Sequence, residues 1–182
     1  MLELKIEEKE LYHQETNKFI QIPACTLTLE HSLISLSKWE SKWKIPYLSK
    51  QERTPKQDLD YVRCMVIGPL KDDKIIDALS FSELKQIQTY ISSPMTATTF
   101  QNTHTNNKKS KNEVMTSEVI YAHMFAHRIP IDCQKWHLNR LLTLLKVCDL
   151  QNAPKEKMTK KQTAMLYAER NAARKAKHNS RG

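Results

Sequence analysis

Apolar and polar residues alternate along the first thirty positions of the chain, with the two-residue period of strands that bury one face. Three short runs follow this period, at 2–6, 19–23 and 25–30. A polar stretch at 13–18 separates the first two runs and has the composition of a turn. The pattern predicts an N-terminal hairpin of 2–6 with 19–23, followed by a third strand at 25–30.

The period then lengthens to that of a helix. Leu33, Leu36, Trp39 and Trp43 recur every three or four positions, which places them on one helical face. Pro46 follows soon afterwards, and the residue before a proline avoids helical backbone angles. We expect this helix to end before Pro46.

Two further helices are predicted from the residues at their starts. Thr54 is a favourable N-cap, and Pro55 suits the first helical position because its missing N–H would have no partner there. A Gly-Pro pair then stops the apolar pattern. Ser80 is the expected cap of a helix over 81–91.

A polar stretch at 101–114 predicts an exposed loop, and a pair of helices follows it. Thr116 is the expected cap of the first helix, which we expect to end at Pro130. Asp132 begins the second predicted helix, whose buried stripe consists of Leu138, Leu141, Leu142, Leu145 and Cys148. So short a connection predicts that the two helices are antiparallel neighbours.

These elements predict an α+β fold that is mostly α, with a small N-terminal β-hairpin or sheet and a basic C-terminal helix. The expected organisation is one domain over 1–154, with a β element at 1–30, a helical front half at 31–100 and a helical hairpin at 116–150, followed by a basic helical tail at 155–182. The tail contains nine Lys and Arg and two Glu, so it contributes +7 of the net charge of +9 of the whole chain. The nearly neutral remainder gives no reason to expect a nucleic-acid-binding face there.

Composition excludes several kinds of protein. The chain has two glycines and neither a G-x-G-x-x-G nor a G-x-x-x-x-G-K motif, which argues against the common nucleotide-binding designs. Its start carries four glutamates in ten residues and no apolar core, unlike a signal peptide. No apolar run approaches the length of a membrane span. We expect a protein of the cytoplasm that does not bind membranes.

Four soft ligands lie close together in sequence. His123 and His127 are four residues apart, as are Cys133 and His137, so two adjacent helices could offer one thiolate and three imidazoles to zinc. The spacing is loose, and the sequence favours ordinary packed helix residues. Cys133 with His137 is also the only local nucleophile pair, and no nucleophile elbow accompanies it. We therefore expect no metal, no cofactor and no enzymatic activity.

The basic tail has a thin apolar face that can hardly stabilise itself by packing. It could bind nucleic acid or an anionic surface, remain a solvated tail, or become ordered on a protein partner. The candidate partner-binding residues are Met158, Met165, Tyr167, Arg170, Arg174 and Lys175. Elsewhere, Trp39 and Trp43 at helical spacing favour a core position over the stacking of bases.

Six segments of the chain carry a resemblance to a known family: SLSKWESKW (35–43), PMTATTF (94–100), TSEVIYAHM (116–124), CQKWHLNRLLTLLKVC (133–148), NAPKEKM (152–158) and NSRG (179–182). Together they resemble small proteins from the tail-gene modules of long-tailed bacteriophages and prophages, some of which are tail assembly chaperones. Trp and aliphatic residues usually stand in that family where this chain has His123, Phe125 and His127. This departure weakens the zinc hypothesis further.

The resemblance implies a non-enzymatic assembly factor. A tail assembly chaperone is expected to cover the long helical tape measure protein in the host cytoplasm until the tail tube forms around it. One alternative is a structural virion component, either a tail connector or a tail-associated subunit, which would be found in the virion. The other alternative is a nucleic-acid-binding accessory protein that acts through the basic tail. A homo-oligomer is compatible with each of these functions.

Overall fold

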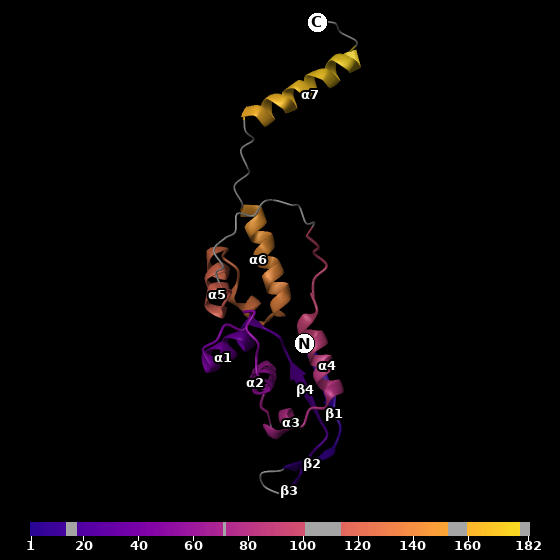
Figure 1. Ribbon diagram of the computed structural model, residues 1–182, viewed down its shortest axis with the longest axis vertical. Coiled ribbons are helices and arrows are strands. Elements are labelled where there is room, and N and C mark those ends of the chain that lie inside the picture. The colour runs from indigo at the N-terminus through magenta and orange to yellow at the C-terminus, as the bar shows by residue number, and fades with distance from the viewer. Residues whose placement is uncertain (14–17, 71, 101–113, 153–159, 179–182) are drawn as a thin grey trace. The chain divides into compact units, whose positions relative to one another are not determined.

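The computed structural model describes residues 1–13, 18–70, 72–100, 114–152 and 160–178. It divides into two compact units, Met1–Cys148 and Asp149–Gly182. The strands are β1 (Leu2–Ile6), β2 (Lys9–His13), β3 (Lys18–Ile22) and β4 (Cys25–Leu29) (Figure 1). The helices are α1 (Leu33–Trp43), α2 (Pro55–Met65), α3 (Lys74–Asp77), α4 (Phe81–Ser92), α5 (Ser117–Ala126), α6 (Leu138–Asn152) and α7 (Lys160–His178), with the 3-10 turn η1 (Ile131–Lys135) between α5 and α6. This confirms the predicted mostly helical fold with a small N-terminal β element.

The strands pair differently from the prediction. β1 pairs with β4, and β2, which the sequence analysis did not assign, pairs with β3. The register is continuous, since Ile6 opposes Cys25 and Lys9 opposes Ile22. The two ladders are thus halves of one antiparallel hairpin, interrupted beside Pro23, which has no N–H to donate. The predicted pairing of 2–6 with 19–23 is wrong, and most of the predicted turn, residues 14–17, lies outside the described residues.

The predicted helix starts in the first half are confirmed by cap hydrogen bonds. Thr54 accepts from the backbone N–H of Gln57, whose side chain in turn accepts from the N–H of Thr54. Ser80 and Glu83 form the same reciprocal capping box at α4. α1 ends when Lys44 adopts a left-handed conformation, before Pro46 as expected.

The second half departs from the prediction. Thr116 caps α5 as expected, but the predicted helix start at Asp132 is wrong, because residues 131–135 form a 3-10 turn and α6 begins at Leu138. The intervening backbone at Trp136 is extended. This lets His137 form a β-bridge with Ser32, and a tertiary contact therefore overrides the local helical tendency.

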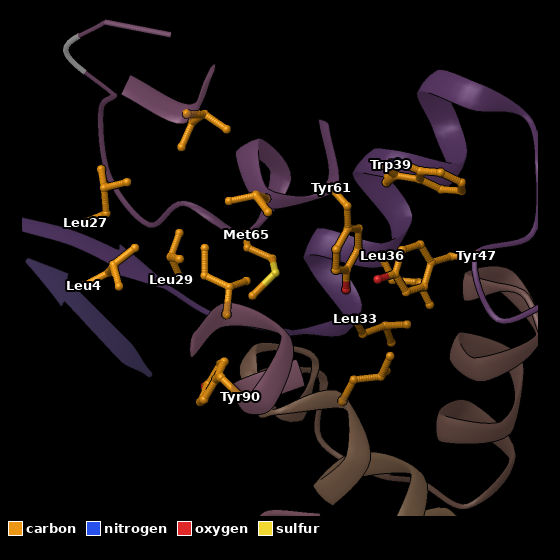
Figure 2. Packing of buried hydrophobic residues seen from close by; sticks show 14 of the residues in the cluster. Leu4, Leu27, Leu29, Leu33, Leu36, Trp39, Tyr47, Tyr61, Met65 and Tyr90 are labelled. Atoms are coloured by element: carbon orange, nitrogen blue, oxygen red, sulfur yellow. The ribbon is translucent and has the colours of Figure 1, made fainter. Parts of the chain in front are cut away.

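The core of the first unit is arranged around α1, which packs against α2, α5 and η1. Leu33, Leu36 and Trp39 on α1 are fully buried beside Tyr61 and Met65 of α2 (Figure 2). Each such side chain contributes about 1.5–3 kcal/mol when it is fully buried. Leucines of β1 and β4 extend the same core, and α4 contacts β1.

The second unit contains α7. Met165 and Tyr167 on this helix are 66% and 59% exposed. Among the described residues, no helix is both long enough and apolar enough to cross a membrane.

Candidate protein-binding site

A run of three buried polar residues connects the hairpin to α1. Glu30, His31 and Ser32 are each at most 8% exposed. The backbone N–H of Glu30 donates to the carbonyl of Met65 (2.9 Å), and the carbonyl of His31 accepts from the N–H of Leu138 (2.7 Å). We call Glu30, His31, Ser32, Tyr61, Tyr90 and His137 the polar junction, because these side chains and their backbone join the hairpin, α1, α2, α4 and α6.

The imidazole of His31 lies at the centre of the polar junction. Its Nδ1 shares a hydrogen bond with the hydroxyl of Tyr61, and its ring meets that of His137 edge to face at 5.0 Å between centroids. Burial, and then the neighbouring imidazole of His137, lower the pKa of His31 from 6.5 to about 4. His31 is therefore neutral at pH 7. Burial also lowers the pKa of His137, against the opposing effects of a backbone hydrogen bond and Glu30.

The polar junction also fixes the C-terminal end of α4. Nε2 of His137 lies 3.1 Å from the carbonyl oxygen of Tyr90. The side-chain amide of Asn139 donates to the carbonyls of Ile91 (3.0 Å) and Ser93 (2.8 Å). The last carbonyls of a helix have no partner within the helix. Residues at the start of α6 therefore supply the partners that α4 needs.

One hydrogen bond joins the side of α4 to the segment between β4 and α1. The hydroxyl of Tyr90 donates to Oε1 of Glu30 at 2.6 Å. Burial and this carboxylate raise the pKa of Tyr90 well above its usual value. At the other end of α4, Lys9 of β2 forms an ion pair with Glu83 at 2.9 Å. The helix is thus held at both ends by neighbouring elements.

An apolar groove lies between α2 and α4, with a volume of about 560 Å³. We call it the α2/α4 groove. Its lining residues are Tyr47, Arg53, Pro55, Asp58, Leu59, Tyr61, Val62, Phe81, Leu84, Lys85, Ile87, Gln88 and Ile91. Tyr61, Val62 and Ile87 are buried, whereas Phe81 is 83% exposed. The groove therefore has an apolar floor and an apolar ring exposed on its wall.

Several aromatic and charged side chains that line the groove contact one another. The rings of Tyr47 and Tyr61 stack with centroids 3.9 Å apart (Figure 2). The guanidinium of Arg53 covers the ring of Tyr47 at 4.4 Å, pairs with Asp58 at 2.9 Å and donates to the Tyr47 carbonyl at 3.1 Å. Burial raises the pKa of Tyr47 to about 12 although Arg53 opposes this. The Arg53 guanidinium and the Asp58 carboxylate are thus paired without a ligand.

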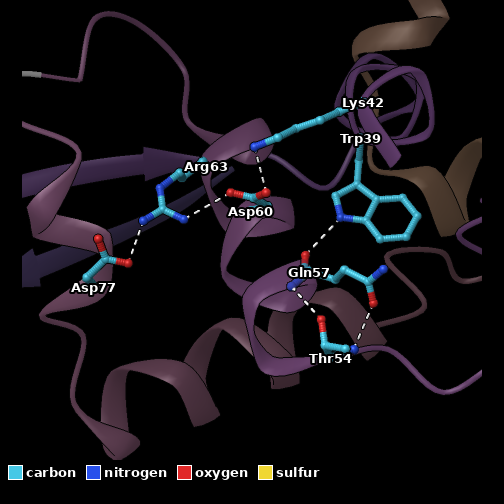
Figure 3. A network of polar contacts seen from close by, with 7 residues as sticks. All are labelled: Trp39, Lys42, Thr54, Gln57, Asp60, Arg63 and Asp77. Atoms are coloured by element: carbon cyan, nitrogen blue, oxygen red, sulfur yellow. Dashed lines mark hydrogen bonds and ion pairs between the residues drawn. The ribbon is translucent and has the colours of Figure 1, made fainter. Parts of the chain in front are cut away.

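A second polar network holds α2 in place on its other side. Asp60 accepts from Lys42 at 2.6 Å and from Arg63 at 3.1 Å, and Arg63 also pairs with Asp77 (Figure 3). Burial alone would raise the pKa of Asp60, but the hydrogen bonds and charges of Lys42 and Arg63 outweigh it and lower that pKa. The indole N–H of Trp39 donates to the Gln57 carbonyl at 2.8 Å. The network joins α2 to α1 and to Asp77 of α3.

The four soft ligands singled out from the sequence do not form a metal centre. His123 is half-buried on α5, His127 is half-buried at the C-cap of that helix, Cys133 is buried in η1, and His137 belongs to the polar junction. Cys133 and His137 do not share a helix, which removes the geometry on which the predicted pair depended. In the described part of the chain, no three His, Cys, Asp or Glu side chains form a group that could hold a metal ion.

Five of the six predicted partner-binding residues of the tail lie along α7. Met165, Tyr167, Arg170, Arg174 and Lys175 are exposed there. Met158 lies outside the described residues. Binding by these residues stays a prediction.

The tryptophans follow the prediction for the core only in part. Trp39 is fully buried, and Trp43 and Trp136 are half-buried. Arg140 covers the ring of Trp136 at 4.2 Å. In the described part of the chain, the indole N–H of Trp43 is buried without a hydrogen-bond partner.

Sequence reasoning missed both the polar junction and the α2/α4 groove. The strand-to-helix run at 30–32 gave one usable signal, since its polar residues interrupt an apolar pattern. The groove gave none, because Phe81 and Leu84 fit an ordinary helical stripe and their exposure depends on how α4 packs. No protein-family model matches the chain, and no curated protein or solved structure matches it either.

Proposed function

We propose that this protein is a non-enzymatic assembly factor of long-tailed phage tails, acting in the host cytoplasm as a chaperone of the tape measure protein. The observation that carries the proposal is the α2/α4 groove. It is apolar and lies between two helices, and its exposed Phe81 would be covered by a bound protein. The sequence resemblance supplies the identity of the client.

The geometry suits binding rather than chemistry. The buried histidines and carboxylates use their hydrogen-bonding capacity on neighbouring elements, as Glu30 does on Tyr90 and His31 on Tyr61. A general acid or base must reach a substrate proton, whereas His31 is 2% exposed. A groove between helices is a common way of holding the apolar face of another helix. A tape measure protein is expected to offer many such faces.

α7 provides a second surface for the same function. It carries exposed Met165 and Tyr167 among six Lys and Arg and a single Glu. Methionine side chains adapt to varied apolar partners. We propose that α7 adds contacts to a client held primarily at the groove.

The test is co-expression of the full chain with the long coiled-coil protein of the same tail module, followed by affinity capture. We expect the client to become more soluble and to co-purify with the chain. The same experiment without residues 155–182 measures what the tail adds, and a weaker yield is expected. Failure of the full chain to capture the client, together with its presence in purified phage particles, would instead indicate a structural virion component.

The charge of α7 favours one second candidate, an accessory protein that binds nucleic acid. Six Lys and Arg on a helix of 19 residues could contact phosphates. Such binding to duplex DNA would weaken steeply as the salt concentration rises. A filter-binding or anisotropy titration with duplex DNA at two salt concentrations tests this candidate, and absence of binding at both concentrations would contradict it.

A further inference from the structure

We infer that the α2/α4 groove is the primary client site and that it takes the apolar face of an amphipathic helix flanked by acidic residues. This inference rests on the proposed function and goes further by naming the surface and the chemistry of the partner. Four kinds of observation carry it: the apolar floor, the internal pairing of Arg53 and Tyr61, the charge at the rim and the position of α4.

The floor and walls of the groove select an apolar ligand. Val62 and Ile87 are buried at its base, while Leu59 and Leu84 are half-buried on the facing helices. Phe81, in the first turn of α4, is 83% exposed. Apolar side chains placed against these residues would remove them from water, at about 25 cal/mol for each Å² buried.

The polar groups of the groove argue against a small polar ligand. Sites for such ligands use a few polar groups that converge on the bound molecule. Here the hydroxyl of Tyr61 is engaged by His31, and the guanidinium of Arg53 is engaged by Asp58 and the Tyr47 carbonyl. A partner that binds through its side-chain methyl groups and rings needs none of them.

The charge at the rim of the groove determines which charge on a partner is attracted. Arg53 and Asp58 offset each other in an ion pair. Lys85 also lines the groove and is exposed, and in the described part of the chain its ammonium makes no ion pair. The rim therefore has an uncompensated positive charge, which would attract a carboxylate at the edge of a bound helix.

The same charge makes α7 a poor occupant of the groove. α7 has six Lys and Arg and one Glu. A copy of α7 in the groove, from the same chain or another, would bring further cations to Lys85 and Arg53, and like charges brought together at an interface cost binding energy. An acidic amphipathic helix is the complementary partner.

The groove is already formed without a partner. α4 is fixed at its start by the ion pair between Lys9 and Glu83, and at its end by Asn139 and His137. α2 is fixed by the network around Asp60. A preformed site avoids the ordering cost that a flexible site has on binding.

The experiment measures the dissociation constant of the full chain for the tape measure protein of its tail module, by calorimetry or anisotropy. Phe81→Ala is compared with Phe125→Ala, because both rings are exposed on helices, at 83% and 64%. We expect Phe81→Ala to weaken binding about tenfold, as for an interface hot spot, and Phe125→Ala to leave it within about twofold.

A second pair of variants tests the charge at the rim. Lys85→Glu is compared with Lys38→Glu, because Lys38 is exposed on α1. Only Lys85→Glu should weaken binding, and more at low salt than at high salt.

The outcomes separate this inference from the proposed function. Tight binding by the wild type with equal affinities for Phe81→Ala and Phe125→Ala would overturn the groove assignment and leave the chaperone proposal intact. Absence of binding by the wild type would overturn both. If the wild type is a dimer and Phe81→Ala alone makes it monomeric in light scattering, the groove binds a second copy and the inference is wrong. Circular dichroism melting confirms that each variant is folded.

Discussion

The buried side chains differ in whether their polar atoms have partners. The indole N–H of Trp39 has a carbonyl to donate to, and that of Trp43, four residues on, has no partner among the described residues. His31 contacts the Tyr61 hydroxyl and the ring of His137, and both its burial and His137 disfavour its charged form. The folded state therefore favours the neutral form of the His31 imidazole.

We predict that His31 makes the protein less stable in mild acid. Because the pKa of His31 in the folded state, about 4, lies below its ordinary value of 6.5, the unfolded chain binds more protons between these two pH values. The contribution of His31 to stability is complete above pH 6.5 and is lost as the pH falls toward 4, by about 3 kcal/mol.

Urea unfolding at pH 7.5, 6 and 5 measures this effect. His31→Gln should be less stable than the wild type at pH 7.5 but should lose less stability on acidification. His123→Gln, a change at a half-buried histidine of α5, is the control and should follow the wild type. Parallel pH curves for the wild type and His31→Gln would show that another group is responsible.

At the scale of the element, the start of α5 depends on a side chain from α1. Glu40 is 7% exposed. Its Oε2 accepts from the backbone N–H of Ser117, the first residue of α5, at 2.7 Å, and its Oε1 accepts from that of Tyr47 at 2.9 Å. The first N–H groups of a helix have no partner within the helix and carry partial positive charge. One carboxylate thus joins α1, α5 and the segment before α2.

We predict that Glu40→Gln lowers the free energy of unfolding by about 1–3 kcal/mol, because a side-chain NH₂ must then face one of the two backbone donors. Glu118→Gln is the matched control, since Glu118 lies in the first turn of the same helix but is exposed. It should cost only about 0.5 kcal/mol. Chemical unfolding at pH 7 gives both values, and equal losses would contradict the role assigned to Glu40.

At the scale of the whole molecule, the two units differ in what stabilises them. All the buried apolar residues of the described chain lie in Met1–Cys148. The second unit presents exposed side chains along α7, including Met165 and Tyr167. Burial of apolar surface is the main source of stability. The first unit therefore contains the interactions that a fold needs, whereas the described side chains of α7 are mostly exposed.

We predict that a chain ending at residue 152, the last residue of α6, folds with the same melting temperature as the full chain, within about 2 °C. Differential scanning calorimetry of the two chains tests this, and the far-ultraviolet dichroism of the short chain should retain its helical signal. A fall of more than about 5 °C would indicate that the core needs the second unit.

Whether a feature could be predicted from the sequence depended on how far apart in the chain its interacting residues lie. Thr54, Ser80 and Thr116 were identified as caps because each bonds a backbone N–H three residues further along the chain. The strand β2 was not predicted because its sequence, KELYH, shows no clear alternation of apolar and polar residues. The α2/α4 groove was missed because exposure of Phe81 follows from the position of α4, which is held by Lys9 and Asn139 from distant parts of the sequence.

The sequence by itself determined most of the helical segments, where several of them begin and that the protein is mostly α with an N-terminal β element. These features depend on periodicity and capping, whose interactions span at most a few residues. Only the tertiary structure decided the pairing of β1 with β4, the 3-10 turn before α6, the buried polar junction and the groove. Each of these depends on contacts between residues far apart in the chain, such as Tyr90 with Glu30, and local pattern carries no information on which distant partner is present.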